Sequence, residues 1–167
     1  VGSKAAVAMA MGKFDTLGRD LVAMVADDAI CVGAEVMTVS NTIDIEKVDE
    51  AVIGAMMEGL KTACLEQKIV VPGGEIAEMP SQVRGLIWNA TAVGIVEKDK
   101  FIDGSKVKEG DFLLGLRSAG FRANGFSLVR RILEDKFGAD WVRADYGDGK
   151  SWGEMVLTPS LIYHRAL

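Results

Sequence analysis

Three strand-type runs follow one another between Lys68 and Leu116, namely KIVV at 68–71, LIWNATAVGIVE at 86–97 and DFLLGL at 111–116. They are rich in the β-branched, aromatic and other apolar residues typical of strands, and no helical periodicity separates them. A regular alternation of strands and helices would predict a doubly wound parallel sheet. This succession instead predicts an α+β fold, in which a mixed or antiparallel sheet has flanking helices.

Further elements are expected on both sides of this stretch. Apolar residues recur at helical spacing in three segments, which predicts helices over about 16–33, 44–67 and 124–136. Apolar alternation predicts two more strands, over about 5–11 and 35–40. The sheet would therefore combine strands from the beginning and the middle of the chain.

The composition limits the class of protein. The chain has 167 residues, of which 49% are hydrophobic and 26% charged, and this is enough for one folded domain with its own core. Its formal net charge of −5 disfavours a broad electrostatic contact with nucleic acid. No apolar run approaches the ~20 residues of a membrane span, so no membrane contact is expected. Two separate cysteines, Cys31 and Cys64, indicate reduced thiols and a cytoplasmic location.

The single histidine, His164, restricts the chemistry that this chain can perform. It excludes a histidine-rich metal centre within the chain and argues against a Ser-His-Asp triad. Any chemistry would therefore depend on carboxylates, lysine, arginine, backbone amides and a hard cation.

Acidic residues gather in the predicted helix at 16–33. Asp20 and Asp27 are seven residues apart and share a face of that helix. Asp28 points about 100° away from Asp27, toward the apolar stripe, and a carboxylate near an apolar face needs a partner. A bound cation is one possible partner, and a solvated face with one hydrogen-bonded aspartate is the alternative.

Two glycine-containing loops could contact an anion. Gly73 and Gly74 directly follow a strand-type run, so their backbone amides could approach a phosphate, with Glu75 beside them as a possible Mg²⁺ ligand. The second loop, SAGFRANGFS at 118–127, leads into a predicted helix and carries Arg122. Helix N-termini and arginine both bind phosphate. An ordinary Gly-Gly turn and a capped turn would explain the same two patterns.

Taken together, these segments closely resemble the phosphoribosylformylglycinamidine cyclo-ligases, also called aminoimidazole ribonucleotide synthetases. The segment GGEIAEMP at 73–80 is similar to that family's GGETAEMP signature. The other matching segments follow in the family's order: GSK at 2–4, FDTLGRDLVAM at 14–24, GAE at 33–35, VGIVEK at 93–98, NGFSLVR at 124–130 and LTP at 157–159. The resemblance extends over essentially all of the chain.

The resemblance implies a domain organisation. The family's chain is about twice as long, so residues 1–157 would form an N-terminal ATP-binding and dimerisation domain that is truncated at its N-terminus. Residues 158–167 would begin a missing C-terminal domain, with Thr158 capping a further helix. In this superfamily, strands of two subunits pair into a barrel, which implies a homodimer.

The resemblance also implies a reaction in de novo purine biosynthesis. The family converts formylglycinamidine ribonucleotide to aminoimidazole ribonucleotide, with ATP and Mg²⁺, by forming a carbon–nitrogen bond. ATP activates the formyl amide oxygen, and an amidine nitrogen then closes the ring. The substrate is a small ribonucleotide, and this chain is expected to be inactive alone because it lacks the second domain.

Site residues follow from the matching positions, although no catalytic base is assigned. The resemblance places Lys4 near the ATP phosphates and Asn124 and Gly125 in a loop that faces the substrate. Together with Gly73, Gly74 and Arg122, whose loops could contact an anion, these are the expected ATP or phosphate contacts. The resemblance places Asp28 and Glu75 at the metal. Arg122 stands where many members have histidine, and arginine cannot act as a general base. Asn41 stands where the family has aspartate, which removes one charge from the nucleotide region.

Two alternatives to the cyclo-ligase remain open. One is a related ATP-dependent enzyme, such as formylglycinamidine ribonucleotide synthetase or the selenophosphate and thiamine-phosphate enzymes. The Glu-Met-Pro at 78–80 favours the cyclo-ligase, whereas a glutamine requirement would indicate the synthetase. The other is a non-catalytic dimerisation module that has lost ligand binding. The departures from the family at Asn41 and Arg122 are the reason to consider it.

Overall fold

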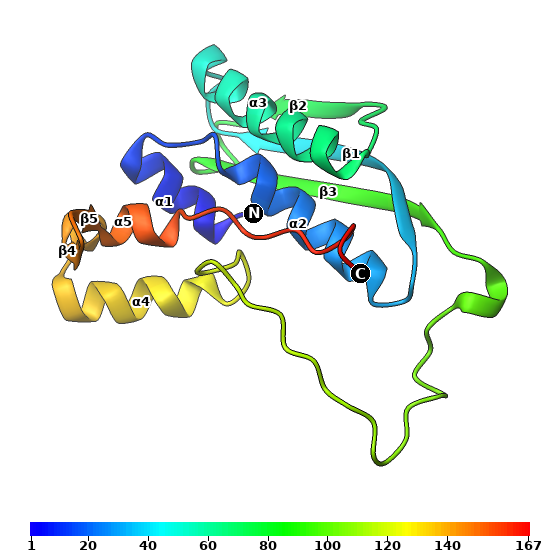
Figure 1. Cartoon of the computed structure of the whole chain (residues 1–167). Helices are drawn as coiled ribbons and strands as arrows, with labels where there is room; N and C mark the ends of the chain where they lie inside the picture. The colour runs from blue at the N-terminus through cyan, green and yellow to red at the C-terminus, as the bar shows by residue number, and fades with distance from the viewer.

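The computed structural model describes all 167 residues and confirms the α+β class. Its main sheet has the strand order β2-β1-β3, in which β1 (Glu35–Ile45) pairs parallel with β2 (Gly74–Glu78) and antiparallel with β3 (Leu86–Ile95). The sheet is therefore mixed, as the sequence predicts. Two helices, α2 (Leu17–Ile30) and α3 (Glu50–Gln67), lie side by side on one of its faces (Figure 1).

The remaining elements lie outside this layer, and those that follow residue 125 lie next to the N-terminal helix (Figure 1). They are α1 (Ser3–Met11), the 3₁₀ turns η1 (Lys98–Lys100) and η2 (Trp141–Arg143), α4 (Phe126–Phe137), the hairpin strands β4 (Asp145–Gly147) and β5 (Lys150–Ser151), and α5 (Trp152–Val156). No helix is long and apolar enough to cross a membrane.

The core forms between the sheet and its helices. Side chains alternate along β1, where Val39, Asn41, Ile43 and Ile45 are buried and the residues between them are exposed or partly buried. Trp88 of β3 is completely buried, and its indole N–H donates to the Asn41 side-chain oxygen at 2.9 Å. One contiguous cluster of 25 buried residues joins the sheet to α1, α2, α3 and α4.

The predicted strand over 5–11 is wrong, because these residues lie in helix α1. Four of the nine residues of α1 are alanine, the residue with the highest helix propensity. Lys4, Ala5, Val7 and Ala8 are buried, which is the spacing of one helical face. A short apolar run fits both a strand and a buried helix, and here the alanine content distinguishes them.

The predicted helix over 44–67 begins later, at Glu50. Residues 44 and 45 instead complete β1, where they pair with both β2 and β3. Asp49 sets the start of α3, because its carboxylate accepts hydrogen bonds from the backbone amides of Ala51 and Val52. The rest of this helix is as predicted, and Met56, Leu60 and Cys64 face the core.

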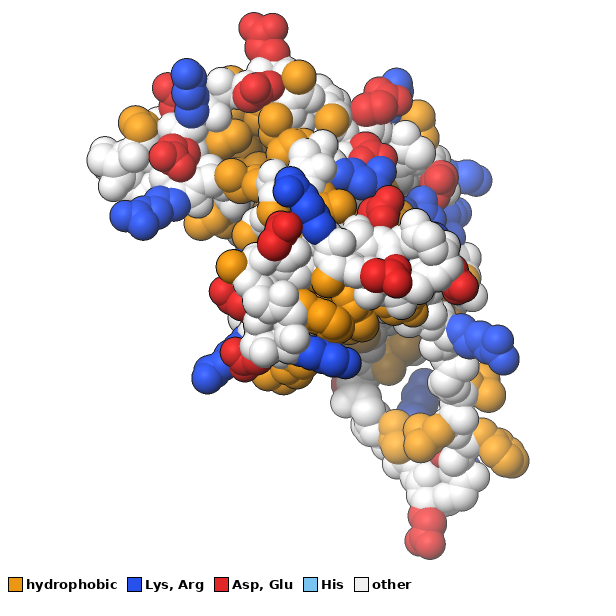
Figure 2. Space-filling view, turned by 90° about the vertical axis from the view of Figure 1, so that its left-hand side faces the viewer, with side chains coloured by type: hydrophobic (Ala, Val, Ile, Leu, Met, Phe, Trp, Pro, Cys, Tyr) orange, Lys and Arg blue, Asp and Glu red, His pale blue; other side chains and the backbone are white.

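Two of the three runs that suggested strands are not regular strands. The run at 111–116 forms no secondary structure, and Phe112, Leu113 and Leu114 are 95%, 100% and 91% exposed. The run at 68–71 makes a single bridge, between Val70 and Thr38. All residues from 97 to 119 are exposed, and the middle of this segment, about 103–116, projects from the rest of the chain (Figures 1 and 2). Within one chain, the run at 111–116 has no strand beside it with which to pair.

Helices α2 and α3 approach each other closely through two glycines. A Cβ atom on Gly59 would lie 2.1 Å from the carbonyl oxygen of Asp15, and one on Gly18 would lie 2.1 Å from the backbone nitrogen of Leu60. Neither position has room for a side chain, so these glycines set the distance between the two helices.

Candidate functional site

The predicted site residues lie in two groups, with Asp28 apart from both. Lys4 and Arg122 lie close together near the N-terminal ends of α1 and α4, and Asn124 and Gly125 directly precede α4. Gly73, Gly74 and Glu75 lie at the start of β2. The sequence alone does not show this division, because it depends on how the helices pack.

Lys4 is completely buried and forms an ion pair with Asp20 of α2, which is also completely buried. The Lys4 ammonium donates to the Asp20 carboxylate at 2.9 Å, to the carbonyl of Thr158 at 3.0 Å and to that of Phe121 at 3.4 Å. Burial lowers the pKa of Lys4, and the Asp20 carboxylate offsets part of this effect. In this arrangement, every polar contact of Lys4 is made with the protein itself.

The last segment of the chain crosses α2 without regular secondary structure, and we call residues 158–165 the strap (Figure 1). Asp20 accepts hydrogen bonds from the backbone amide and the hydroxyl of Ser160, at 3.0 and 2.6 Å. Asp27 accepts from the backbone amides of Tyr163 and His164, at 2.9 and 3.1 Å. The two aspartates that share a face of α2 therefore hold the strap. The further helix expected after Thr158 does not form among residues 158–167.

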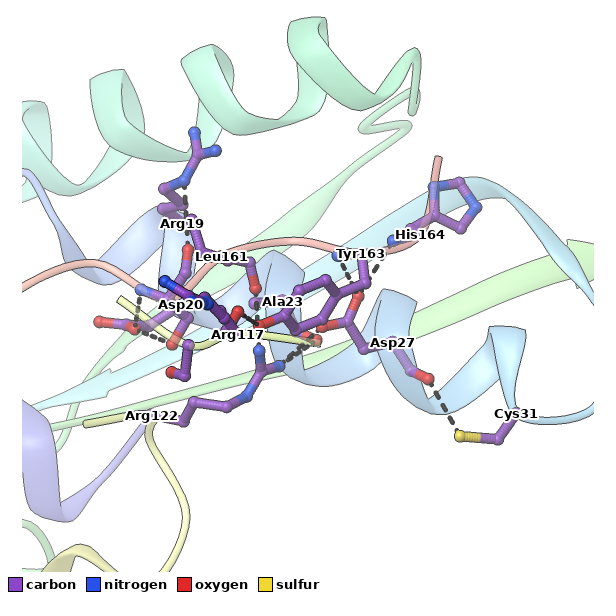
Figure 3. A network of polar contacts seen from close by, with 12 residues as sticks. Arg19, Asp20, Ala23, Asp27, Cys31, Arg117, Arg122, Leu161, Tyr163 and His164 are labelled. Carbon is purple, nitrogen blue, oxygen red and sulfur yellow. Dashed lines mark hydrogen bonds and ion pairs between the residues drawn. The ribbon is translucent and has the colours of Figure 1, made fainter. Parts of the chain in front are cut away.

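Arg122 connects the loop before α4 with both α2 and the strap (Figure 3). Its guanidinium donates to the Asp27 carboxylate at 2.7 Å and to the carbonyls of Leu161 and Ala23 at 2.9 and 3.3 Å. It also lies 5.4 Å from the centre of the Tyr163 ring, within the range of a cation–π contact. Its predicted contact with phosphate stays a prediction.

Gly73, Gly74 and Glu75 border a hollow of about 470 Å³, together with Asn41 and Met57. A Cβ atom on Gly74 would lie 2.4 Å from the Asn41 carbonyl oxygen, so only glycine fits here. Asn41 is itself held by the hydrogen bond from Trp88. The loop therefore packs against the fixed Asn41 on one side and borders the open hollow on the other.

The two predicted metal ligands are exposed and lie on different elements. Asp28, near the end of α2, makes no hydrogen bond or ion pair, so the structure does not place it against the apolar face. Glu75, in β2, accepts only from the amide of Ile76, at 3.0 Å. No group of three or more His, Cys, Asp or Glu side chains is arranged to hold a metal ion. The chain thus offers single free carboxylates, which suit Mg²⁺ only if phosphate oxygens supply further ligands.

Asn124 and Gly125 form an exposed turn at the start of α4. Gly125 has a positive φ of 68°, which favours glycine, and no side chain caps the helix. The first amides of α4 therefore lack a side-chain acceptor, and such a helix end suits an anion. The Ser3 and Ser127 hydroxyls lie 3.0 Å apart, which ties this helix end to α1.

The structural roles of Asp20, Asp27, Ser160, Tyr163 and His164 were not predicted. His164, the single histidine, accepts a hydrogen bond from the Val36 amide through Nε2 at 2.8 Å, and burial lowers its pKa. It thus joins the strap to β1 as a neutral ring. The spacing of Asp20 and Asp27 was the available signal, but nothing in the sequence pairs them with residues about 140 positions away.

The fold is an α+β domain with a mixed three-stranded sheet, and a solved structure has a similar fold. Hydrogenase maturation protein HypE, solved in complex with ATP, has a similar fold, with a TM-score of 0.50 over 55% of this chain and 28% of that chain. The sequence identity is 18%, so this likeness shows the fold alone.

The sequence identifies the family. Residues 1–96 match the family described as AIR synthase related protein, N-terminal domain, and the chain belongs to this family. It is 40% identical over 167 residues to phosphoribosylformylglycinamidine cyclo-ligase of Thermococcus kodakarensis, covering all of this chain and 49% of the relative. It is 43% identical over 163 residues to the enzyme of Pyrococcus furiosus, covering 98% and 48%. The chain thus spans about half the length of these relatives, and the resemblance seen in the sequence is confirmed.

Proposed function

We propose that this chain is the N-terminal half of a phosphoribosylformylglycinamidine cyclo-ligase. The observation that carries the proposal is the identity of about 40% with these enzymes, which extends over the whole chain. The full-length protein would convert formylglycinamidine ribonucleotide to aminoimidazole ribonucleotide in the cytoplasm. Residues 1–157 would form its N-terminal domain, and residues 158–167 would lead into the second.

Bound ATP would supply the phosphoryl group that activates the formyl amide oxygen of the substrate. The backbone amides of Gly73 and Gly74, and those at the start of α4 after Asn124 and Gly125, would hold phosphate oxygens. Both loops are open on one side and are held on the other by buried contacts. Fixed amides of this kind stabilise charge without rearrangement, which suits phosphoryl transfer.

Magnesium would be held by exposed carboxylates of this chain together with phosphate oxygens. Asp28 and Glu75 are free of ion pairs, as such ligands must be. Because they lie on different elements, each would act as a single ligand rather than as part of a preformed protein cage. Lys4 and Arg122 add positive charge near the second loop, although Asp20 and Asp27 balance it in this arrangement.

The proposal predicts a specific pattern of ATP use. The full-length protein with Mg-ATP is expected to release ADP only when formylglycinamidine ribonucleotide is added, and to do so without glutamine. Release that requires glutamine would favour formylglycinamidine ribonucleotide synthetase. No release, together with unchanged thermal unfolding in Mg-ATP, would favour the non-catalytic module, because a ligand at 100 times its Kd adds about 2.7 kcal/mol.

We also propose that two copies associate through the uncovered face of the sheet. Opposite the helices, this face exposes the apolar side chains of Met37, Ile87, Val93 and Ile95, which are 42% to 65% accessible. Met37, Val93 and Ile95 lie near one another where the first half of β1 pairs with β3, and a group of exposed apolar side chains of this kind favours a protein interface. The exposed apolar run at 111–116 would gain a strand partner in the same association.

Replacing Val93 with lysine is therefore expected to convert a homodimer to a monomer, because an ammonium would be buried in the interface. Light scattering of the full-length protein at micromolar concentration measures the mass directly. Leu128→Lys on α4 is the matched control, since Leu128 is exposed to a similar extent but lies away from the sheet. A monomeric unsubstituted protein would contradict the proposal, and so would a Val93→Lys dimer of unchanged stability.

A further inference from the structure

Arg122 lies where three separate segments meet. It belongs to the loop before α4, it bonds to Asp27 and Ala23 of α2, and it donates to the carbonyl of Leu161 in the strap. These three acceptors surround the guanidinium, whose planar set of donors matches several acceptors at once (Figure 3). The arginine side chain thus forms all of its hydrogen bonds with acceptors of the protein itself.

A second connection runs through Tyr163. The Tyr163 hydroxyl donates to the carbonyl of Arg117 at 2.5 Å, and its ring lies against the Arg122 guanidinium. Its backbone amide donates to the same Asp27 that receives Arg122. The loop is therefore tied at two points, Arg117 and Arg122, to the strap at Leu161 and Tyr163 and to α2 at Ala23 and Asp27.

The ion pair between Arg122 and Asp27 is less exposed to water than an ion pair on the surface of the same chain. The Asp27 side chain is 14% exposed and that of Arg122 is 32% exposed, whereas Arg131 and Asp135 on α4 are 82% and 75% exposed. The Asp27 carboxylate accepts one hydrogen bond from Arg122 and two from backbone amides. Hydrogen bonds to a charged group stabilise more than those between neutral groups.

We propose that Asp27, Arg122 and Tyr163 form a clasp that positions the loop at 117–125, and that Arg122 acts through this clasp rather than by contacting a phosphate. The clasp fixes Asn124 and Gly125 relative to α2. It also couples them to the strap, which leads toward the second half in relatives of twice the length. Arg122 and Asp27 are positioning residues, and the kinetic part of this inference rests on the proposed function.

The structural part can be tested without activity, by hydrogen–deuterium exchange on the full-length protein. Arg122→Gln and Asp27→Asn are each expected to speed exchange at the Tyr163 and His164 amides by about tenfold or more, since each removes the charged contact. The double variant should exchange no faster than the faster single variant. Arg131→Gln, which breaks only the exposed pair with Asp135, is the matched control and should change nothing.

Other variants separate the clasp from general loss of stability. Tyr163→Phe removes only the hydroxyl contact with Arg117 and should speed exchange at residues 160–165 to a smaller extent. The amides of β1 should keep their original rates in every variant. Equal acceleration in β1 would show a global effect and would overturn the proposal, as would unchanged exchange at Tyr163 in Arg122→Gln.

The kinetic part distinguishes a clasp from a phosphate contact. If Arg122 positions the loop, Asp27→Asn and Arg122→Gln lower kcat/KM for the ribonucleotide to the same extent, and the double variant resembles either one. Arg122→Lys should fail as Gln does, because a lysine cannot replace the guanidinium fork. A direct phosphate contact would instead raise KM in Arg122→Gln alone. If the unsubstituted protein showed no activity, the proposed function would fail while the exchange results would still decide the clasp.

Discussion

Replacing Lys4 with methionine is expected to lower the free energy of unfolding by about 3–5 kcal/mol. The substitution keeps most of the side-chain volume but leaves the Asp20 carboxylate buried without its cation. Asp20 is completely inaccessible, so water cannot take the place of the ammonium. Two carbonyl acceptors, those of Thr158 and Phe121, lose their donor at the same time.

Urea denaturation of the 167-residue chain measures this change, with the fluorescence of the buried Trp88 and Trp141 as the signal. Lys61→Met is the control, because its ion pair with Glu58 is more than 60% exposed on both sides and should cost less than about 1 kcal/mol. Adding Asp20→Asn to Lys4→Met should restore part of the loss, since the buried charge is then gone. A loss below about 1 kcal/mol in Lys4→Met would show that the ammonium is not held as described.

Replacing Gly59 with alanine is expected to destabilise the chain by about 3 kcal/mol, the upper part of the range for overpacking. The added Cβ would lie 2.1 Å from the Asp15 carbonyl oxygen, and backbone cannot move away as a flexible side chain can. Helices α2 and α3 would have to separate, which disturbs the packing of Leu60 and its neighbours.

The same helix provides a control of opposite sign. Gly54 lies in α3 with no atom within 4 Å of the position of a Cβ. Gly54→Ala should therefore stabilise the chain by about 0.5–1 kcal/mol, because alanine loses less conformational freedom on folding than glycine does. Thermal unfolding of the two variants compares them directly. If both changed stability in the same direction, the close approach of α2 and α3 would not exist.

The sequence predicts the sheet region well where local pattern and long-range pairing agree. The run at 86–97 becomes β3, and the periodic apolar residues of 50–67 become α3. The prediction from sequence fails where the apolar pattern is short, or where a strand needs a second strand with which to pair. The alanine-rich segment at 5–11 fits two structures, and the run at 111–116 has strand composition but no neighbouring strand within the chain.

The candidate site divides in the same way. The glycine loop at Gly73 and Gly74 is visible in the sequence because it has a short motif, and the structure adds that Gly74 has no room for a side chain. The contacts of Asp20, Asp27 and Arg122 depend on the strap, which is far away in the sequence. Helical spacing shows that the two aspartates share a face, but it does not show what that face contacts.

Asp28 illustrates the limit of helical geometry. Its position relative to Asp27 suggested a carboxylate near the apolar stripe that needs a partner. In the structure it is exposed, and the buried acid of this helix is Asp20 instead. Asp20 is buried because it has a cationic partner: α1 packs against α2 and brings the Lys4 ammonium to the Asp20 carboxylate.

The most direct test of the proposed activity is the stoichiometry of the reaction catalysed by the full-length protein. Formylglycinamidine ribonucleotide and Mg-ATP would be supplied without glutamine, and the products would be quantified by chromatography and mass spectrometry. The proposal predicts one aminoimidazole ribonucleotide for each ADP released. ADP release without formation of the imidazole ring, or formation of the ring without ADP, would contradict it.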